Sequence, residues 1–138
     1  MFDIVVKNGI VVDGTGNPWF KADVGIKDGR ISDIGKLPSS KSKETLDAKG
    51  LVVAPGFIDM HAHSDFSLLI NPLAESKVRQ GVTTDVVGNC GSSAAPLNDF
   101  LKEEIRKTSP VLEEAKLKLN WSTMDEYLKR LEKNGVAL

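Results

Sequence analysis

Cysteine and histidine are scarce in this chain: Cys90 is the only cysteine, and His61 and His63 are the only histidines. A single cysteine cannot close an intrachain disulfide, so the sequence excludes a disulfide-stapled secreted scaffold. The Cys90 thiol is therefore left for packing or for metal binding.

Long apolar runs and an excess of one charge are also missing. No run reaches the roughly 18 apolar residues of a membrane span, and the first residues, with Asp3 and no basic stretch, do not resemble a signal peptide. The 18 Lys and Arg residues nearly balance the 19 Asp and Glu residues. This balance gives no electrostatic reason to bind nucleic acid or an anionic membrane, so neither is expected as a partner. Because neither a signal peptide nor a membrane span is recognised, we expect a cytoplasmic location.

Residues 1–54 contain short β-prone runs separated by turn residues. Asp28-Gly29 lies between two of these runs and predicts a two-residue hairpin turn. A polar loop is expected at residues 38–43. So short a region supplies only a small sheet core, so it is not expected to be a complete domain. The predicted strands cover residues 4–7, 10–12, 22–26, 30–34 and 51–54.

Residues 55–138 change in character, because strand-like and helix-like segments alternate after Pro55-Gly56. Such alternation predicts an α/β fold with a parallel sheet. Gly81 and Gly135 are expected to end helices, and Ser122 or Thr123 to cap the last one. The predicted strands are 57–61 and 82–87, the predicted helices are 73–80, 98–107, 111–119 and 123–133, and residues 135–138 look like the start of another strand.

The two histidines stand at the end of the first of these strands. Side chains alternate across a strand, so one face carries polar and chemically active groups and the other is apolar. Two imidazoles two residues apart can approach one metal, and neutral histidine is a preferred zinc ligand. A hydrogen-bonded surface pair is the alternative, but the preceding Pro-Gly and the nearby acidic residues favour metal. The polar face holds Phe57, Asp59, His61 and His63, the apolar face holds Ile58, Met60 and Ala62, and Asp65 follows.

Cys90 follows the second strand and is therefore expected at the same end of the sheet as the histidines. Its thiolate could be a metal ligand, and the alternative is a small buried apolar residue. A nucleophilic role is less favoured, because it usually enlists a histidine as base and both histidines are assigned to metal. The glycines that flank Asn89-Cys90 predict a tight turn or a close approach of the backbone.

Two strings of residues resemble a known family. Residues 54–65, APGFIDMHAHSD, resemble the first barrel strand of the amidohydrolase superfamily. Residues 80–92, QGVTTDVVGNCGS, are similar to the N-acyl-D-amino-acid deacylases, also called D-aminoacylases. Residues 3–14 and 22–35 resemble the N-terminal β-domain of that family. The resemblance covers the whole chain, but only the first third or less of a family member.

The resemblance implies a β-sandwich portion at residues 1–54 and, at residues 55–138, the first two strand-helix units of an incomplete (β/α)8 barrel with Zn2+ at its mouth. In that family the residue matching Cys90 binds the tightly held zinc, whereas the pair matching His61 and His63 belongs to a second, weaker site. The implied reaction hydrolyses the amide of a small N-acyl-D-amino acid to a carboxylate and a D-amino acid. The general-base aspartate and further histidines are expected beyond Leu138, so no catalytic residue is assigned here and the isolated chain is expected to be inactive.

Two alternatives remain open. One is a cyclic amidohydrolase of the dihydroorotase or hydantoinase type; Asn89-Cys90-Gly91 disfavours it, because those enzymes generally bridge two metals with a modified lysine. The other is a non-enzymatic metal-binding or interaction module. An open parallel edge can pair with another chain, and a second chain could supply the rest of the barrel.

Overall fold

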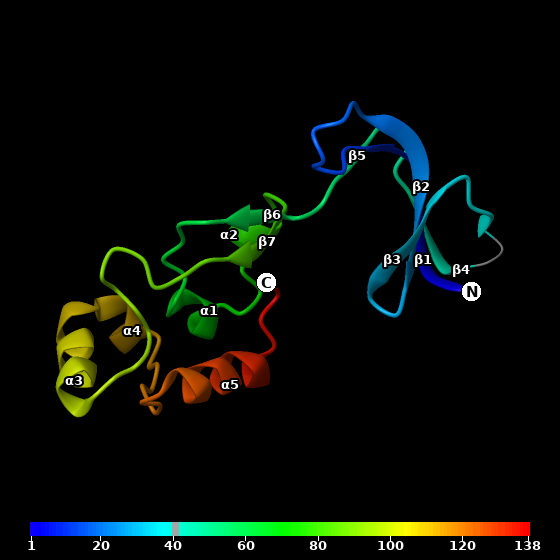
Figure 1. Cartoon of the computed structure of the whole chain (residues 1–138). Helices are drawn as coiled ribbons and strands as arrows, with labels where there is room; N and C mark the ends of the chain where they lie inside the picture. Colours follow the sequence, from blue (N-terminus) through cyan, green and yellow to red (C-terminus); the bar gives the residue numbers. More distant parts are fainter. Residues whose placement is uncertain (40–41) are drawn as a thin grey trace. The chain divides into compact units, whose positions relative to one another are not determined.

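The structure, a computed structural model, describes residues 1–39 and 42–138 (Figure 1). The chain divides into two compact units, Met1–Pro55 and Gly56–Leu138. No helix within the described ranges is both long enough and apolar enough to cross a membrane.

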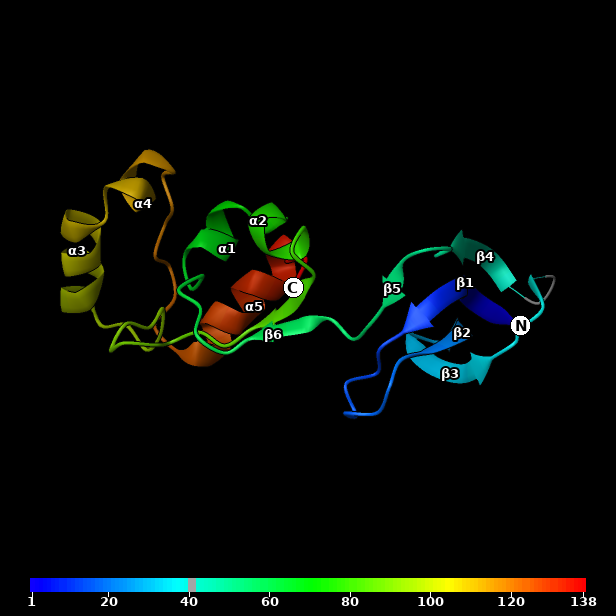
Figure 2. The same ribbon diagram turned by 90° about the horizontal axis from the view of Figure 1, so that it is seen from above.

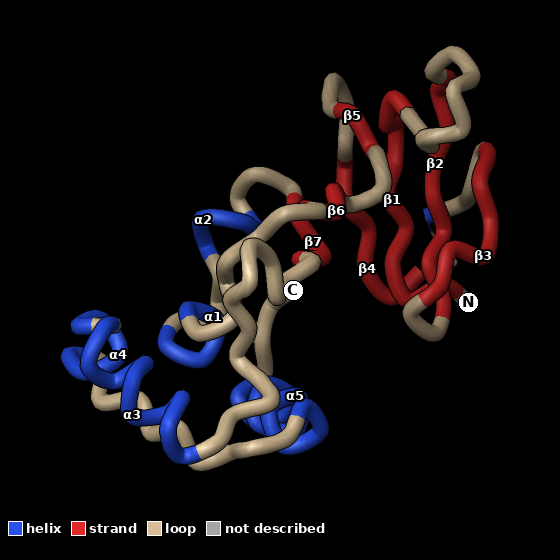
Figure 3. Tube along the Cα trace, turned by 60° about the vertical axis from the view of Figure 1, so that its left-hand side comes forward, coloured by secondary structure: helices blue, strands red, loops and turns tan. Residues whose placement is uncertain are grey.

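The first unit is a mixed sheet whose centre is β1 (Phe2–Val11). Its hydrogen-bonded order is β3-β2-β1-β4, and β5 also pairs with β1 (Figure 3). The β1–β2 and β2–β3 pairs are antiparallel, whereas β4 and β5 run parallel to β1. The remaining strands are β2 (Phe20–Lys27), β3 (Arg30–Gly35), β4 (Ser42–Asp47) and β5 (Val52–Val53).

The hairpin predicted at Asp28-Gly29 is present between β2 and β3. Both turn residues have positive φ, 51° for Asp28 and 71° for Gly29, as a turn matched to the strand twist requires. Residues 4–7 and 10–12, by contrast, are predicted as two strands but lie in the single strand β1, with Asn8-Gly9 inside it. Asn8 has a φ of 61°, and the register with β2 shifts between Val6 and Gly9, so the pair forms an irregularity within one long strand.

The prediction of a loop at residues 38–43 is wrong at its C-terminal end. Ser42 and Lys43 begin β4, whereas Ser40 and Lys41 lie outside the described residues. Apart from Ser42, every residue of β4 is exposed. The strand therefore depends on backbone pairing with β1 and not on an apolar pattern that could be read from the sequence.

Asp23 is a buried charged residue of the first unit, 6% exposed. It accepts a hydrogen bond from Lys7 Nζ at 2.7 Å and others from the backbone N–H groups of Asn8 and Leu37. Burial alone would raise the pKa of its carboxyl, but these hydrogen bonds outweigh it and lower the pKa to about 2.

The second unit contains the parallel pair β6 (Phe57–Asp59) and β7 (Val82–Asp85), followed by helices. Figure 2 shows α5 beside α1, and α3 next to α4. The predicted α/β class is confirmed, and the described residues form no closed barrel. The helices are α1 (Ser67–Ile70), α2 (Glu75–Val78), α3 (Asp99–Thr108), α4 (Pro110–Glu114) and α5 (Met124–Asn134).

Several predicted bounds change. β6 ends at Asp59 and not at His61, β7 ends at Asp85 and not at residue 87, and the helix predicted at 73–80 is only one turn, α2. The helix predicted at 111–119 ends at Glu114, and α1 was not predicted. No strand forms at residues 135–138, where the Ala137 N–H instead donates to the Pro72 carbonyl. These short elements are set by tertiary contacts and not by long periodic patterns.

The glycine before β6 is required by close packing. A Cβ at Gly56 would lie 2.1 Å from the Thr83 hydroxyl oxygen on β7, so only glycine lets the two parallel strands approach at this point. Gly81, expected as a helix stop, has a φ of 80° directly before β7. Both glycines thus fix where the parallel pair begins.

Helix α5 is capped as expected, because Thr123 and Glu126 form a reciprocal capping box and Gly135 ends the helix with a φ of 72°. Its Tyr127 packs in the core beside Trp121, which is 2% exposed. The Trp121 indole N–H donates to the Ala94 carbonyl at 2.7 Å. The core cluster consists of Leu69, Ala94, Ala95, Leu97, Leu119, Trp121 and Tyr127.

Replacing Asp23 with Asn should lower the free energy of unfolding by roughly 1–3 kcal/mol near neutral pH, because the carboxylate that accepts three hydrogen bonds is lost. The folded-state pKa lies below the ordinary 3.8, so this stabilisation is fully present above pH 3.8 and disappears as the pH falls toward about 2. The difference in Tm between wild type and Asp23→Asn, followed by circular dichroism, should therefore shrink over that interval.

Asp33→Asn is the matched control, since Asp33 is exposed on β3, and it should stay within about 0.5 kcal/mol of wild type. A Tm difference for Asp23→Asn that stays constant down to pH 2 would contradict the assignment.

Candidate metal centre

His61, His63 and Cys90 form a cluster in the second unit. Each offers one ligand atom, and these three atoms all lie within 4.8 Å of one another. His61 Nε2 is 3.1 Å from Cys90 Sγ, and the two imidazole rings are 5.4 Å apart between centroids. All three side chains are exposed. Tertiary structure therefore joins the three residues that the sequence singled out.

The donor set and its spacing fit a zinc ion. Zn–N bonds of about 2.1 Å and Zn–S bonds of about 2.3 Å place tetrahedral ligand atoms roughly 3.5 Å apart. A separation within 4.8 Å therefore needs only small side-chain rotations to reach one ion. Two imidazoles and a thiol are also typical ligands of zinc, whereas calcium and magnesium bind oxygen ligands.

The backbone brings the three residues together by extending the parallel pairing past the strands. The Val86 N–H donates to the Asp59 carbonyl and the Ala62 N–H donates to the Val86 carbonyl. Ala62, which separates the two histidines, is 2% exposed. The histidines thus stand on either side of an anchored residue, directly beside the segment that leads to Cys90.

The loop that carries Cys90 is a succession of left-handed residues. Gly88 and Gly91 have φ values of 82° and 74°, and Cys90 itself has a φ of 55°. The tight turn expected from the glycines is therefore present. A non-glycine residue in this region costs about 1 kcal/mol or more and persists only where its surroundings hold it.

A charged network lies beside the histidines. Lys77 of α2 pairs with Asp59 and lies 3.4 Å from Asp85 Oδ1. The Asp85 side chain is 2% exposed, and its other oxygen accepts a hydrogen bond from the Ser64 hydroxyl at 2.5 Å. The Lys77 hydrogen bond, helped by the His61 backbone N–H, lowers the pKa of Asp59, and the same bond raises the pKa of Lys77. The network fixes α2 to the ends of β6 and β7.

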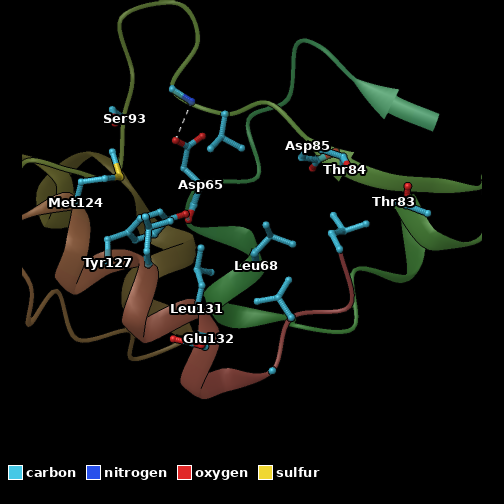
Figure 4. Close-up of a pocket in the computed structure, with 16 residues that line it drawn as sticks. Asp65, Leu68, Thr83, Thr84, Asp85, Ser93, Met124, Tyr127, Leu131 and Glu132 are labelled. Atoms are coloured by element: carbon cyan, nitrogen blue, oxygen red, sulfur yellow. Dashed lines mark hydrogen bonds between the residues drawn. The ribbon is translucent and has the colours of Figure 1, made fainter. Parts of the chain in front are cut away.

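Asp65 is buried and holds the start of the Cys90 loop. Its Oδ1 accepts a hydrogen bond from the Gly88 N–H at 3.1 Å, the dashed line in Figure 4. Its carbonyl accepts a hydrogen bond from the Tyr127 hydroxyl at 2.7 Å. Burial, with the nearby charge of Asp65, raises the pKa of Tyr127 to about 12. Neither Asp59 nor Asp65 belongs to the cluster of donors.

A cavity of about 640 Å³ adjoins this segment and is lined in part by Leu68, Tyr127 and Leu131. Figure 4 draws the side chains that line it. Its lining includes Asp65 and Gly88 but none of the three donor residues. The cavity is therefore separate from the donor cluster.

The apolar face predicted for the first strand is only partly covered. Ala62 is buried, but Ile58 and Met60 are 59% and 67% exposed. The described helices therefore leave most of this face uncovered. Helices α1, α3 and α5 contribute side chains to the core around Trp121 and Tyr127, whereas α2 packs beside β7.

Sequence reasoning assigned no role to Lys77, Ser64 or Asp85, and did not find that the Asn89 side chain connects the two segments of the site. One signal was available: Asp85 ends a β-branched run, and a carboxylate that becomes buried at such a position requires a cationic or donor partner. Nothing in the sequence alone identified Lys77 as that partner. Its position depends on how α2 packs beside β7.

Comparison with known proteins gives consistent matches. Residues 44–132 match the sequence model described as Amidohydrolase family, and residues 1–57 match that of the urease alpha-subunit N-terminal domain. An N-acyl-D-glutamate deacylase of Alcaligenes xylosoxydans xylosoxydans is 50% identical over 94 residues, which cover 68% of this chain and 19% of that protein. An N-acyl-D-aspartate deacylase of the same organism is 35% identical over 136 residues, which cover 99% of this chain and 26% of that protein.

A solved structure matches as well. The N-acyl-D-glutamate deacylase of Bordetella bronchiseptica, complexed with zinc and a phosphonate inhibitor, has a TM-score of 0.80 and 38% identity. The match covers 96% of this chain and 27% of that one. The chain thus spans about a quarter or less of the length of these relatives.

Replacing Lys77 with Met should lower the free energy of unfolding of the second unit by roughly 1–3 kcal/mol, because the buried Asp85 carboxylate loses its cation. Urea unfolding can be followed by the fluorescence of Trp121 in a Trp19→Phe background. Lys129→Met removes an exposed pair with Asp125 and should change stability by less than about 1 kcal/mol. Equal losses in the two variants would contradict a special role for Lys77.

Proposed function

The chain belongs to the amidohydrolase family, and we propose that its function is zinc-dependent hydrolysis of the amide bond of N-acyl-D-amino acids. The family match over residues 44–132 also confirms the resemblance first seen in two short motifs. The products are a carboxylate and a D-amino acid. The observation that carries the proposal is the meeting of His61, His63 and Cys90 in a chain whose relatives include deacylases.

Within this proposal, His61, His63 and Cys90 are ligands of Zn2+; the family resemblance divides them between two neighbouring zinc sites, with Cys90 in the tighter site and the two histidines in the weaker one. The ligand atoms converge within 4.8 Å, and the exposure of all three side chains leaves the centre open to a small substrate. When bound, zinc supplies Lewis acidity toward the amide carbonyl and makes water easier to deprotonate. The protein's own contribution is to hold the donors in place through the Ala62–Val86 pairing and the Lys77 network.

The described residues offer no free carboxylate as general base at this centre. Asp59 is paired with Lys77, Asp85 is engaged by Ser64 and Lys77, and Asp65 accepts from the Gly88 backbone. We therefore propose that these residues supply metal ligands, whereas proton transfer to the leaving amine requires a group outside them.

Zinc binding by the purified chain tests the ligand set. Wild type should bind zinc, and each of His61→Ala, His63→Ala and Cys90→Ala should lower the affinity at least about tenfold, because each removes one donor. Metal content and titration calorimetry measure this. Ser92→Ala changes an exposed side chain beside the same loop and should leave the affinity unchanged. Zinc content that is insensitive to all three donor substitutions would refute the site.

Hydrolysis of N-acetyl-D-glutamate, with the L enantiomer as control, tests the reaction. The 138-residue chain loaded with zinc should show no turnover, because the described residues provide no free base. If the coding sequence continues past Leu138, the longer product should hydrolyse the D enantiomer and lose that activity with Cys90→Ala. A longer product that is active on neither enantiomer, or only on the L form, would contradict the proposed substrate class.

A further inference from the structure

The side chain of Asn89 lies between the two halves of the donor cluster. Its amide nitrogen donates to the Ala62 carbonyl at 3.0 Å and to the Val86 carbonyl at 2.8 Å. Ala62 separates the two histidines, and Asn89 directly precedes Cys90. One side-chain amide therefore connects the backbone of the histidine pair to the backbone of the thiol loop.

These bonds complete the hydrogen bonding of Ala62. Its N–H already donates to the Val86 carbonyl, so both of its backbone polar groups are tied to the segment of residues 86–89. Because Ala62 is 2% exposed, water cannot readily replace a lost donor at its carbonyl. Removing the Asn89 amide would leave a buried acceptor without a partner, which is costly.

The backbone at Cys90 needs such a restraint. Cys90 has a φ of 55°, and Gly88 and Gly91 on either side of it also have positive φ. The Gly88 N–H donates a hydrogen bond to Asp65. Without a fixed residue 89, the loop could relax and carry the thiol away from His61, whose Nε2 now lies 3.1 Å from it. Strained positions persist only where neighbouring contacts determine them.

We propose that Asn89 is a positioning residue that fixes Cys90 against His61 and His63 and so sets the geometry of the metal centre. The proposal rests on the zinc site proposed above. The two backbone acceptors face the same side-chain amide, so a donor pair on a short side chain is required. Asparagine meets that requirement, whereas an isosteric leucine or a shorter alanine does not.

The test uses Co2+ as a probe, because a thiolate ligand gives cobalt a charge-transfer band in the near ultraviolet. Asn89→Leu keeps the size and neutrality of the side chain but removes both donors. It should lower Co2+ affinity about 10–100-fold, the usual effect of losing a group that orients a ligand, and weaken the thiolate band at saturation. Asn17→Leu is the matched control, since Asn17 is exposed and its amide contacts only Thr15, and it should leave both unchanged.

Asn89→Ala serves as the second variant if Asn89→Leu does not fold, as judged by Trp121 fluorescence. Wild-type affinity and an undiminished band in a folded Asn89 variant would overturn the positioning role while leaving the zinc site intact. Cys90→Ala supplies the spectrum without a thiolate. Wild-type protein that lacks the band would instead refute Cys90 as a ligand.

A measurement on the metal-free chain tests the positioning role of Asn89 independently of any metal. The side-chain amide protons of Asn89 should exchange with solvent more slowly than those of Asn17 in nuclear magnetic resonance spectra, because the Asn89 amide donates to two backbone carbonyls, one of them that of the buried Ala62. In Asn89→Leu, the backbone resonances of His61, His63 and Cys90 should shift. Equal exchange at the two asparagines, with no shift at the donor residues, would overturn the inference even if the metal site failed.

Discussion

The parallel pairing of β6 with β7, continued by the hydrogen bonds between Ala62 and Val86, is the constraint on which the donor cluster depends. It places the two strands side by side although 22 residues, which include α1 and α2, lie between Asp59 at the end of β6 and Val82 at the start of β7. Gly56 permits the close approach at one end, and Asn89 connects the two segments at the other. The histidines and the thiol then meet as a consequence of backbone pairing.

Each unit uses a lysine to satisfy a buried aspartate. Lys7 pairs with Asp23 in the first sheet, and Lys77 pairs with Asp85 next to the parallel strands. A carboxylate in such a position is costly unless it is paired and hydrogen-bonded. In both units the pair joins different elements of the fold, β1 with β2 in the first unit and α2 with β7 in the second.

In the proposed function, the residues that position the metal ligands are separate from the group that transfers protons. The described carboxylates near the cluster serve the scaffold: Asp59 and Asp85 through Lys77, and Asp65 through the Gly88 backbone. The three donors remain exposed, which is what a centre open to substrate requires. The proposed reaction and the proposed role of Asn89 both follow from this division of roles.

Local sequence determined the features that depend on neighbouring residues: the Asp28-Gly29 hairpin, the Thr123 capping box, the helix stop at Gly135, and His61, His63 and Cys90 as candidate ligands. It did not determine β4, whose exposed residues show no apolar pattern, or the short α1 and α2. Nor did it identify Lys77 and Asn89 as partners of the site. Their roles arise from hydrogen bonds and ion pairs between segments separated in the chain, and only tertiary structure decides which segments meet.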